Sequence, residues 1–544
     1  MLARTCDRYP RIGVLLGLLL VAENVQAQTE LRRWSIAGIN YVDSLPDLDG
    51  DAFPELVIGN YTFGQQNYGR VYAIGSLANQ VLYTYQGTQN SYLGANVTTL
   101  GDVSGDGFPD FAAGSLRGTL VFDGRNGTLL FESPAQSVRI LPLGDMTGDD
   151  LAEFLVAGQL LYQGGSFELL YGIQPPPNAY SFGLWATTLG DVDGDGITDF
   201  AVGAPGGSQI FKVGRVYAFS GAKGALLYEL VGESPYDLFG AKVAGSGDLT
   251  GDGIGDLVVA APSLLVQSPS GLSKGRLSFY NGRTGELFAQ LDAPANYTQL
   301  GDNLDEAGDV DGNGTGDLLV FARQVGPSGK DLIWTVDGAT REILYALDGS
   351  ISPPFVGGGL DWNGDDFPDF MTYPYPIPYW VLYSGAPKGV SVFGKPCAPK
   401  GKEAPRIGAS GVAEIGDAFP IHLSRVKPFE RALLVLGIPG TVATERIRSS
   451  TRDCALGLVP QTWILSVASE VRPGAGVATV ELEIPNDPTL VGSQFDAQWL
   501  VLDGPTGLRP MASTRILSVQ IQPAGTNPTV RFPATGSTRS PRVR

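Results

Sequence analysis

Short apolar segments separated by glycine-rich turns fill most of the chain. An apolar run such as "FAVGAP" from Phe200 is followed by an alternating segment, "GRVYAFSG" from Gly214, and by another, "GALLYEL" from Gly224. Alternation with a period of two, together with β-branched and aromatic residues between glycines, is typical of β-strands. No stretch with the 3.6-residue period of an amphipathic helix competes with this pattern. The sequence therefore predicts an all-β fold.

An eleven-residue acidic segment interrupts the strand pattern seven times. Its copies recur every 43 to 61 residues, which is the scale of a four-stranded propeller blade. Each repeat is predicted to hold four strands, with the acidic loop between the first and the second. The copies are "PDLDGDAFPEL" from Pro46, "GDVSGDGFPDF" from Gly101, "GDMTGDDLAEF" from Gly144, "GDVDGDGITDF" from Gly190, "GDLTGDGIGDL" from Gly247, "GDVDGNGTGDL" from Gly308 and "LDWNGDDFPDF" from Leu360.

A single four-stranded sheet of this kind cannot bury both of its faces, so neighbouring repeats must stack and the ring must close. Seven repeats therefore predict a seven-bladed β-propeller. Residues 30–38, "ELRRWSIAG", precede the first loop and could supply an outer strand to the last blade.

The N-terminus has the features of an export signal. Arg4, Arg8 and Arg11 precede the apolar run 12–22, and small residues up to Ala27 form a cleavage site. A membrane anchor is the alternative, but about 11 apolar residues are too few, since a bilayer requires roughly 20. We expect residues 1–27 to be a signal peptide, and we expect the exported chain to be soluble, without a transmembrane segment.

A composition change near residue 395 predicts a second domain. We assign residues 28–395 to the propeller and the segment 396–411, with "GKPCAPKGKEAPRIGASG" across it, to a linker. Segments such as "FPIHLSRV", "WILSVA" and "VATVELEIP" predict a small β-sandwich over residues 412–525. Residues 526–544 form a basic tail. The predicted fold class is thus all-β, with a seven-bladed β-propeller followed by a small β-sandwich domain.

Cysteine usage fits an oxidising compartment. Cys6 leaves with the signal peptide, so Cys397 and Cys454 remain as a pair. A disulfide between them is the prediction, and two buried free thiols are the alternative.

The acidic loops predict metal sites. Positions 1, 3, 5 and 9 of each copy carry oxygen-bearing side chains, and glycine at position 4 permits a tight turn. Alternate positions in such a turn point to a common centre, which the backbone carbonyl of position 7 can join. This is an oxygen cage for a hard cation such as Ca²⁺. No histidine or cysteine takes part, which argues against zinc and copper.

The predicted ligands follow this numbering, with the position-7 residue offering its carbonyl. They are Asp47, Asp49, Asp51, Phe53 and Glu55; Asp102, Ser104, Asp106, Phe108 and Asp110; Asp145, Thr147, Asp149, Leu151 and Glu153; Asp191, Asp193, Asp195, Ile197 and Asp199; Asp248, Thr250, Asp252, Ile254 and Asp256; Asp309, Asp311, Asn313, Thr315 and Asp317; and Asp361, Asn363, Asp365, Phe367 and Asp369.

The sequence of these loops allows two other interpretations. Asp and Gly also dominate Asx-turns between strands, and this alternative stays open for the third loop, with Asp150 at position 6, and for the sixth, with Asn313. An EF-hand or dockerin loop would need flanking helices, whereas these loops run into strands. The formal net charge of −19 is smaller than the number of carboxylates at the ligand positions, so without cations the loops should repel one another. We therefore predict up to seven structural Ca²⁺ ions.

These residues resemble a known family. "FGLWATTLGDVDGDGITDFAVGAP", from Phe182 to Pro205, is similar to the FG, acidic-loop and GAP segments of the FG-GAP repeat in the integrin α-subunit propeller and its bacterial secreted relatives. The resemblance covers about residues 34–395, although copies such as "VIGNY" from Val57 and "MTYPY" from Met371 lack the full motif. It implies a seven-bladed propeller with calcium on the rim of one face. Integrins keep only some of the metal loops, so the resemblance alone does not carry over integrin-type ligand recognition.

The C-terminal part, above all "IPNDPTLVGSQFDAQWLVLD" from Ile484, resembles a small all-β module of secreted proteins of planctomycete-type bacteria.

We expect a secreted module, either extracellular or on the cell surface, that acts in binding or adhesion. Its expected partner is a protein or a carbohydrate, and we expect the chain to be a monomer. The alternative is a calcium-dependent polysaccharide lyase or hydrolase on a propeller scaffold, for which a carboxylate pair or a tyrosine and arginine site stays open. His422 is the single histidine and lies in the sandwich, away from the acidic loops, so a Ser/His/Asp or zinc-hydrolase mechanism has little material. We therefore expect no enzyme activity. A pI of 4.5 and the lack of a basic patch disfavour nucleic-acid binding.

Overall fold

The structure is a computed structural model of the whole chain. It describes residues 28–524 except for 35–40, 49–53, 65, 76–79, 136–138, 207–211, 264–273, 295–296, 325–330, 349–355, 362–366, 373–379, 388–389, 394–403, 410–412, 428–429, 438–445, 449–452, 456–459, 468, 473–474, 503–509 and 515. The predicted signal peptide and tail lie outside these residues, so both stay predictions.

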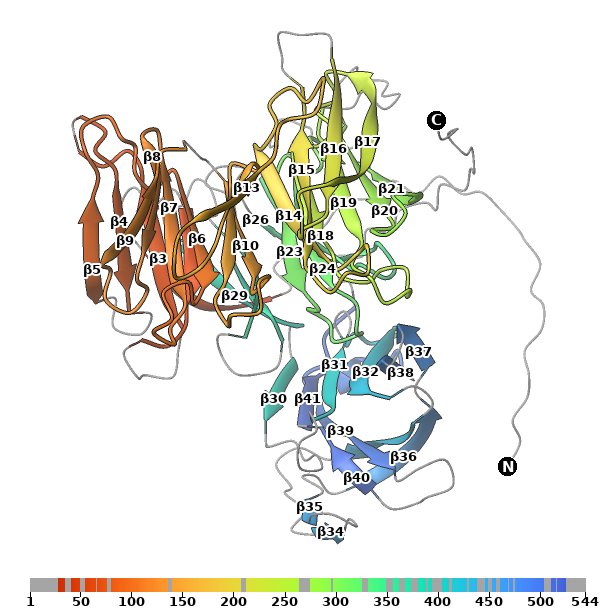
Figure 1. Ribbon diagram of the computed structural model, residues 1–544. Coiled ribbons are helices and arrows are strands. Elements are labelled where there is room, and N and C mark those ends of the chain that lie inside the picture. Colours follow the sequence, from red (N-terminus) through yellow and green to blue (C-terminus); the bar gives the residue numbers. More distant parts are fainter. Residues whose placement is uncertain are drawn as a thin grey trace.

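Seven antiparallel sheets, each of four or five strands, occupy the described part of residues 28–387 (Figure 1). The first three sheets follow the chain order without crossing over. They are β2 (Tyr41–Leu45), β3 (Glu55–Asn60), β4 (Arg70–Ile74) and β5 (Val81–Gln86); β6 (Asn96–Gly101), β7 (Asp110–Ser115), β8 (Gly118–Phe122) and β9 (Leu129–Ser133); and β10 (Ile140–Gly144), β11 (Glu153–Val156), β12 (Leu160–Tyr162) and β13 (Leu169–Gly172).

The next three sheets repeat this arrangement, and the sixth has one short extra strand. They are β14 (Trp185–Gly190), β15 (Asp199–Ala204), β16 (Val213–Phe219) and β17 (Leu226–Pro235); β18 (Lys242–Gly245), β19 (Leu257–Ala261), β20 (Arg276–Tyr280) and β21 (Leu287–Asp292); and β22 (Tyr297–Thr298), β23 (Leu304–Gly308), β24 (Asp317–Gln324), β25 (Asp331–Val336) and β26 (Ile343–Asp348).

The seventh sheet joins the two ends of this region. It holds β27 (Val356–Leu360), β28 (Asp369–Thr372) and β29 (Trp380–Pro387), and its fourth strand is β1 (Gln28–Trp34) from the start of the described chain. β1 pairs antiparallel with β29, with Trp34 opposite Trp380. Residues 30–34 of the predicted closing segment therefore do form an outer strand of the last sheet.

The first strand of each sheet packs against the first strand of the next. β2 contacts β6, and the series continues through β10, β14, β18 and β23 to β27. Each acidic loop connects the first of these strands to the second, as predicted. The all-β propeller fold is therefore confirmed, while the number of blades in the closed ring stays a prediction that the seven sheets support.

The second strand of each propeller sheet is apolar in its middle because both of its faces are covered. In β19, Leu257 and Val259 pack with the fourth sheet, while Val258 and Ala260 pack with the sixth. All five β19 residues are buried. Burying one such side chain contributes about 1.5 to 3 kcal/mol, so the stacked sheets stabilise one another. This explains why the sequence has unbroken apolar runs after the acidic loops.

The C-terminal domain consists of two facing sheets and a small hairpin. One sheet holds β30 (Val390–Phe393), β41 (Ile516–Gln520), β39 (Gln494–Leu502), β33 (Arg431–Gly437), β36 (Pro460–Val467) and β40 (Pro510–Ser513); the other holds β31 (Arg406–Ala409), β32 (Ala418–Val426), β38 (Ala475–Glu483) and β37 (Ser469–Arg472). β34 (Arg446–Arg448) pairs with β35 (Asp453–Ala455), and a 3₁₀ turn, η1 (Pro488–Leu490), precedes β39.

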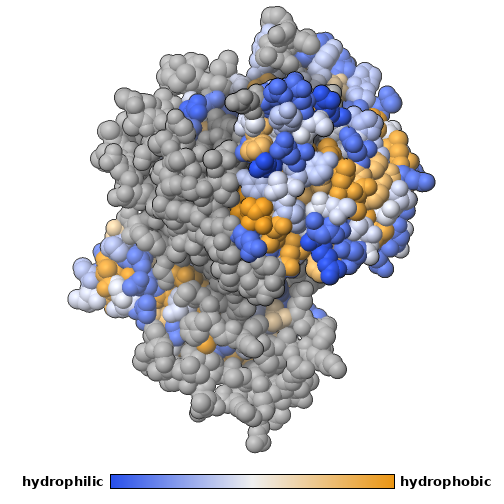
Figure 2. All heavy atoms as spheres, turned by 90° about the vertical axis from the view of Figure 1, so that its left-hand side faces the viewer, coloured by the Kyte–Doolittle hydropathy of each residue, from blue (hydrophilic) through white to orange (hydrophobic). Residues whose placement is uncertain are grey.

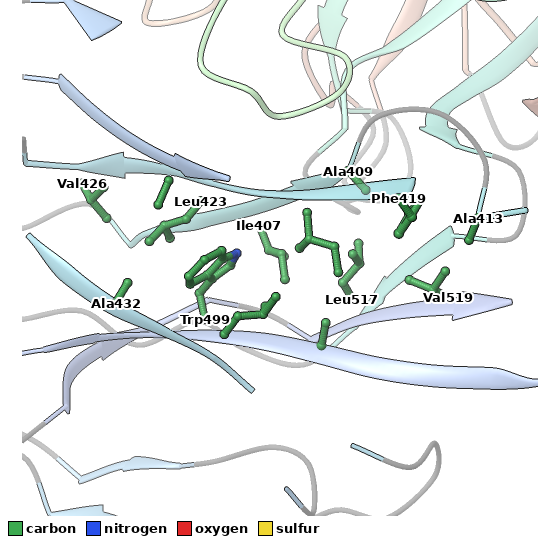
Figure 3. Packing of buried hydrophobic residues seen from close by; sticks show 14 of the residues in the cluster. Ile407, Ala409, Ala413, Phe419, Leu423, Val426, Ala432, Trp499, Leu517 and Val519 are labelled. Carbon is green, nitrogen blue, oxygen red and sulfur yellow. The ribbon is translucent and has the colours of Figure 1, made fainter. Parts of the chain in front are cut away.

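A buried apolar core lies between these two sheets. Figure 3 shows Leu423 and Phe419 of one sheet facing Trp499 and Leu517 of the other, and each of these four side chains is fully buried. Strands with one covered face and one solvated face give the period-two pattern from which the sandwich was predicted.

Two strands lie on the other side of the predicted domain boundaries. The predicted boundary at residue 395 places β30 in the propeller, but β30 pairs with β41 of the C-terminal domain. The predicted linker 396–411 includes β31, but β31 pairs with β32 of the C-terminal domain. Both strands complete sheet edges of the sandwich, and the reason is that strand pairing depends on partners far along the chain, which composition does not reveal.

The outer surface mixes polar and apolar residues. Figure 2 shows the side of the molecule where β5 lies, with hydrophobic patches set among hydrophilic ones. Outermost strands carry exposed apolar side chains, such as Val81 on β5, Leu129 on β9 and Leu169 on β13. Single exposed apolar residues are ordinary on protein surfaces.

Among the described residues, no helix has the length and hydrophobicity needed to cross a membrane.

Candidate metal centre

The fourth acidic loop brings three carboxylates together. Asp191, Asp193 and Asp195 each offer an oxygen, and these oxygens lie within 4.8 Å of one another. Asp191 is half-buried and the other two side chains are exposed. Like charges about 4 Å apart repel by roughly 1 kcal/mol in water and by about 4 kcal/mol near a protein surface. The arrangement is therefore one that a bound cation would stabilise.

Backbone amides hold the first carboxylate of this loop in place. Asp191 accepts hydrogen bonds from the backbone N–H groups of Gly194 at 2.7 Å and Gly196 at 2.9 Å. Both glycines have left-handed backbones, with φ of 83° and 88°. A Cβ at either position would meet nothing within 4 Å, so the backbone angle and not crowding requires glycine.

The carboxylate at position 9 has a structural role that sequence reasoning missed. Asp199 is fully buried. One of its oxygens accepts hydrogen bonds from the amides of Val192 and Asp193, at 2.8 and 3.1 Å. Its other oxygen accepts from Gly221 at 2.8 Å, in the turn between β16 and β17. Position 9 therefore fastens the acidic loop to the far hairpin of its own sheet.

The same contact recurs in four other sheets. A buried position-9 carboxylate accepts a hydrogen bond from a glycine amide in the turn between the last two strands, through the pairs Asp110 and Gly124, Glu153 and Gly164, Asp256 and Gly282, and Asp317 and Gly338. Burial raises the pKa of these carboxyls, that of Asp110 to about 6. The signal in the sequence was the glycine that follows each third strand.

The donor set fits a hard cation. Where a Ca²⁺ ion binds, Asp191, Asp193 and Asp195 would hold it through oxygen atoms, which is the ligand type that calcium prefers. The aspartates also make Asx-type hydrogen bonds, such as Ile197 N–H to Asp195 at 2.9 Å. These bonds stabilise each carboxylate separately, whereas a bound cation would compensate the combined charge of all three.

In the third and fifth loops, an amide side chain from the turn between the last two strands also hydrogen-bonds to the loop. The position-5 carboxylate accepts a hydrogen bond from an amide side chain in each, from Gln163 to Asp149 at 3.2 Å and from Asn281 to Asp252 at 2.7 Å. Their first carboxylates, Asp145 and Asp248, accept backbone amides as Asp191 does. The second loop, through Asp102, follows the same plan.

The sixth loop is a second acidic cluster with a different surrounding. Asp309, Asp311 and Asp317 place oxygens within 4.8 Å of one another, and the last two are buried. Burial, followed by the charge of Asp311, raises the pKa of Asp317 well above its ordinary value. The third carboxylate of this cluster, Asp317, comes from position 9, because position 5 is occupied by Asn313.

An arginine of the C-terminal domain contacts this sixth loop. The Arg406 guanidinium lies 3.0 Å from the Asp309 carboxylate and donates a hydrogen bond to the Asp309 carbonyl at 2.9 Å. Only 6% of its side chain is exposed. Backbones also meet here, because a Cβ on Gly408 would lie 2.4 Å from the Asp311 carbonyl oxygen. The C-terminal domain therefore covers the sixth loop.

The seventh loop also reaches the C-terminal domain. Phe367, at position 7, is fully buried in the sandwich core with Ile407 and Leu423. The Arg406 guanidinium lies 5.7 Å from the centre of its ring. Asp369, at position 9, is buried, whereas Asp361, at position 1, is exposed. Phe367 thus has a packing role that its position in a metal motif did not indicate.

Several predicted residues lie outside the described part of the chain. These are Asp49, Asp51 and Phe53 of the first loop, Asn363 and Asp365 of the seventh, and Cys397. Of the first loop, Glu55 is buried and accepts the Leu48 amide at 2.6 Å. Only the backbone of Cys454 is described, on β35. The disulfide and all the metal ligands stay predictions.

His422 lies nearer to an acidic loop than the sequence suggested. It is buried on β32, where Nδ1 is 2.9 Å from the hydroxyl of Thr479. Burial, and then the charge of Arg406, lower its pKa to about 4. The strand beside it carries Arg406 to Asp309, so His422 belongs to the interface between the two domains. This environment keeps the imidazole neutral.

Comparisons with known proteins agree with the geometry. The FG-GAP repeat model matches residues 183–219, which include the whole fourth loop. Integrin alpha-V of Gallus gallus is 24% identical over 326 residues, 56% of this chain and 30% of that protein. Integrin alpha-4 of Xenopus laevis is 34% identical over 149 residues, 25% of this chain and 14% of that protein. Integrin alpha-5 of Xenopus laevis is 27% identical over 220 residues, 37% of this chain and 21% of that protein.

The chain spans less than a third of the length of these relatives. Their similarity and the repeat match confirm the predicted resemblance to an integrin-α-like FG-GAP propeller. The resemblance of the C-terminal module to one from bacterial secreted proteins stays a prediction.

Proposed function

We propose that this integrin-α-like FG-GAP propeller is an extracellular, calcium-binding module that recognises a protein or carbohydrate ligand. The observation that carries the proposal is the convergence of Asp191, Asp193 and Asp195 within 4.8 Å in the fourth loop. Oxygen donors on a tight backbone turn suit Ca²⁺ better than a transition metal.

Calcium would act on stability. Extracellular calcium sites have dissociation constants of about 10⁻⁴ to 10⁻³ M. At millimolar calcium this corresponds to on the order of 0.5 to 1.5 kcal/mol for each occupied loop. Occupation of most loops would then contribute several kcal/mol, a large share of the ~5 to 15 kcal/mol that stabilises a typical domain. A medium with millimolar calcium is extracellular, which is why we propose export and a secreted or cell-surface location.

Binding rather than catalysis is the function we propose. The integrin relatives suggest a binding or adhesion module, and His422, the single histidine, is buried with a pKa lowered to about 4. None of the described features favours the lyase or hydrolase alternative. We propose that the chain binds its protein or carbohydrate ligand as a monomer.

Direct calcium binding tests the proposal. Isothermal titration of the purified full chain with CaCl₂ should give several sites in the range of about 10⁻⁴ to 10⁻³ M, with MgCl₂ as the control ion. Asp193→Ala should remove one site, whereas Asp123→Ala, in the β8–β9 turn, should remove none. Absence of calcium binding would contradict the proposal.

A second assay separates binding from catalysis. Arrays of glycans and of extracellular proteins should retain the chain in calcium and lose it in EDTA. Turnover of acidic polysaccharides that a single substitution outside the acidic loops abolishes would overturn the binding function in favour of an enzyme.

A further inference from the structure

The strand that carries Arg406 has one face for each domain. Ile407 and Ala409 of β31 are buried in the core between the two sandwich sheets. Successive side chains of a strand point to opposite faces, so Arg406 and Gly408 share the other face. Both of them contact the sixth acidic loop. This face of β31 therefore presents a cation and, two residues away, a position without a side chain to the propeller.

The position-1 carboxylates of the fourth and sixth loops have different hydrogen-bond donors. Asp191 accepts from backbone amides of its own loop. One oxygen of Asp309 accepts the Gly314 amide at 3.1 Å and also the Arg406 guanidinium at 3.0 Å. A second nitrogen of Arg406 donates to the Asp309 carbonyl at 2.9 Å, so the guanidinium is held at two points. A positive charge of the protein thus lies on the carboxylate that begins the metal motif.

Position 5 of the sixth loop carries an amide in place of a carboxylate. Asn313 Oδ1 accepts the backbone N–H of Thr315 at 2.8 Å, which fixes the orientation of the amide because its nitrogen cannot accept. Asn313 Nδ2 then donates to Asp311 and to Asp337, in each case at 3.1 Å. In the fourth loop, Asp195 also accepts a backbone amide with one oxygen, but its other atom is a carboxylate oxygen. The sixth loop therefore presents a hydrogen-bond donor where the fourth presents an acceptor.

The C-terminal domain also closes the approach to the sixth loop. A Cβ on Gly312, at position 4, would lie 2.6 Å from the Gly408 Cα. A Cβ on Gly194, at position 4 of the fourth loop, would meet nothing within 4 Å. At position 3, Asp311 is buried whereas Asp193 is exposed. The turn that faces solvent in the fourth loop is thus covered by β31 in the sixth.

We propose that the sixth acidic loop is a docking site for the C-terminal domain, in which the Arg406 guanidinium replaces calcium. The residues present do not suit the ion, because a cation on Asp309 would meet the like charge of Arg406, and Asn313 turns N–H groups toward the carboxylates. Extracellular calcium sites have dissociation constants of about 10⁻⁴ to 10⁻³ M, so a hundredfold weakening leaves such a loop mostly empty at millimolar calcium.

This docking makes the attachment of the C-terminal domain independent of calcium, and it leaves calcium to the other acidic loops. The exclusion of calcium rests on the proposed calcium-binding function of those loops. The docking contact rests only on Arg406, Gly408 and the loop that they cover. Two measurements therefore test the inference, one for each part.

Calcium stoichiometry of the full chain tests the exclusion. Equilibrium dialysis with radioactive calcium counts the ions bound by the parent chain, by Asp191→Asn and by Asp309→Asn, which change the same motif position and keep the side-chain shape. Asp191→Asn should lower the count by one ion, whereas Asp309→Asn should leave it unchanged. Asp309 Oδ1 is buried without a hydrogen-bond partner, so it is the oxygen through which an ion would bind. Loss of one ion in Asp309→Asn would overturn the exclusion.

Limited proteolysis of the full chain, in calcium and in EDTA, tests the docking. Mass spectrometry measures the rate of cuts between the two domains. This rate should be the same in both buffers for the parent chain, and about tenfold higher in both for Arg406→Gln, because a buried ion pair is broken. Arg425→Gln removes an exposed arginine from β32 of the same domain and should be cut like the parent. If Arg406→Gln does not fold, Asp309→Asn breaks the same pair and should also be cut faster.

The outcomes separate this inference from the proposed function. Faster cutting of the parent chain between the domains in EDTA, or unchanged cutting of the folded Arg406→Gln variant, would overturn the docking while calcium binding stands. A parent chain that binds no calcium would contradict the proposed function, and the proteolysis of Arg406→Gln would still decide whether the sixth loop holds the C-terminal domain.

Discussion

The fourth and sixth acidic loops share one eleven-residue plan but lie in opposite environments. Asp193, at position 3 of the fourth loop, is exposed, whereas Asp311, at the same position of the sixth, is buried where Gly408 of the C-terminal domain meets the loop. Arg406 already compensates the charge of Asp309. The comparison shows two ways to compensate the negative charge of this motif. A cation from solvent can do so in an exposed loop, and a positively charged side chain of the C-terminal domain can do so in a covered loop.

The largest expected effect separates the two loops by their calcium dependence. Asp309→Ala leaves Arg406 buried without its carboxylate, which should cost about 3 kcal/mol of unfolding free energy. Urea denaturation should show a similar loss in calcium and in EDTA. If the loss occurred only in calcium, the sixth loop would be a metal site like the fourth.

The covered region should also be sensitive to acid. The pKa of His422 is lowered to about 4, from an ordinary 6.5, by burial and by Arg406. The unfolded chain therefore binds the proton first, and stability that is complete above about pH 6.5 falls as the pH drops to about 4, by about 2 to 3 kcal/mol. Denaturation at several pH values would show this loss, and His422→Gln should abolish that part of it. An unchanged pH profile in His422→Gln would contradict the assignment.

Close backbone contact makes the domain interface sensitive to a single methyl group. A Cβ on Gly408 would lie 2.5 Å from the Gly312 Cα, so Gly408→Ala should cost about 1 to 3 kcal/mol and loosen the C-terminal domain. Gly172→Ala is the control, because its Cβ would approach only the Leu160 side chain, at 3.5 Å. Limited proteolysis between the domains should increase for the first variant alone. Equal proteolysis of both would mean that the covered loop is not tightly packed.

The sequence predicted the environment of the exposed fourth loop better than that of the covered sixth loop. The period-two pattern located the strands, and the acidic spacing located the turns, because both depend on neighbouring residues. Arg406 and Asp309 are 97 positions apart, and Phe367 of a metal motif packs into the sandwich core. Contacts of this kind arise from domain docking, on which the local pattern has no bearing. A cavity lined by residues of β2, β6, β10, β14, β18 and β23 could not be predicted for the same reason, because its walls come from six different sheets.

The smallest effect belongs to the open loop. Asp191→Ala should lower stability by on the order of 1 kcal/mol in millimolar calcium, because one ion is lost, and by much less in EDTA. Thermal unfolding of the variant and the parent chain in both buffers measures the difference. A loss of equal size in the two buffers would mean that Asp191 supports only the turn, as in an Asx-turn without metal.

Thermal unfolding of the intact chain in millimolar CaCl₂ and in EDTA tests the central idea most directly. Calcium held in several loops should raise the melting temperature by roughly 5 to 10 °C, and MgCl₂ should not replace it. Identical melting temperatures in calcium and in EDTA would contradict calcium binding as the role of the acidic loops.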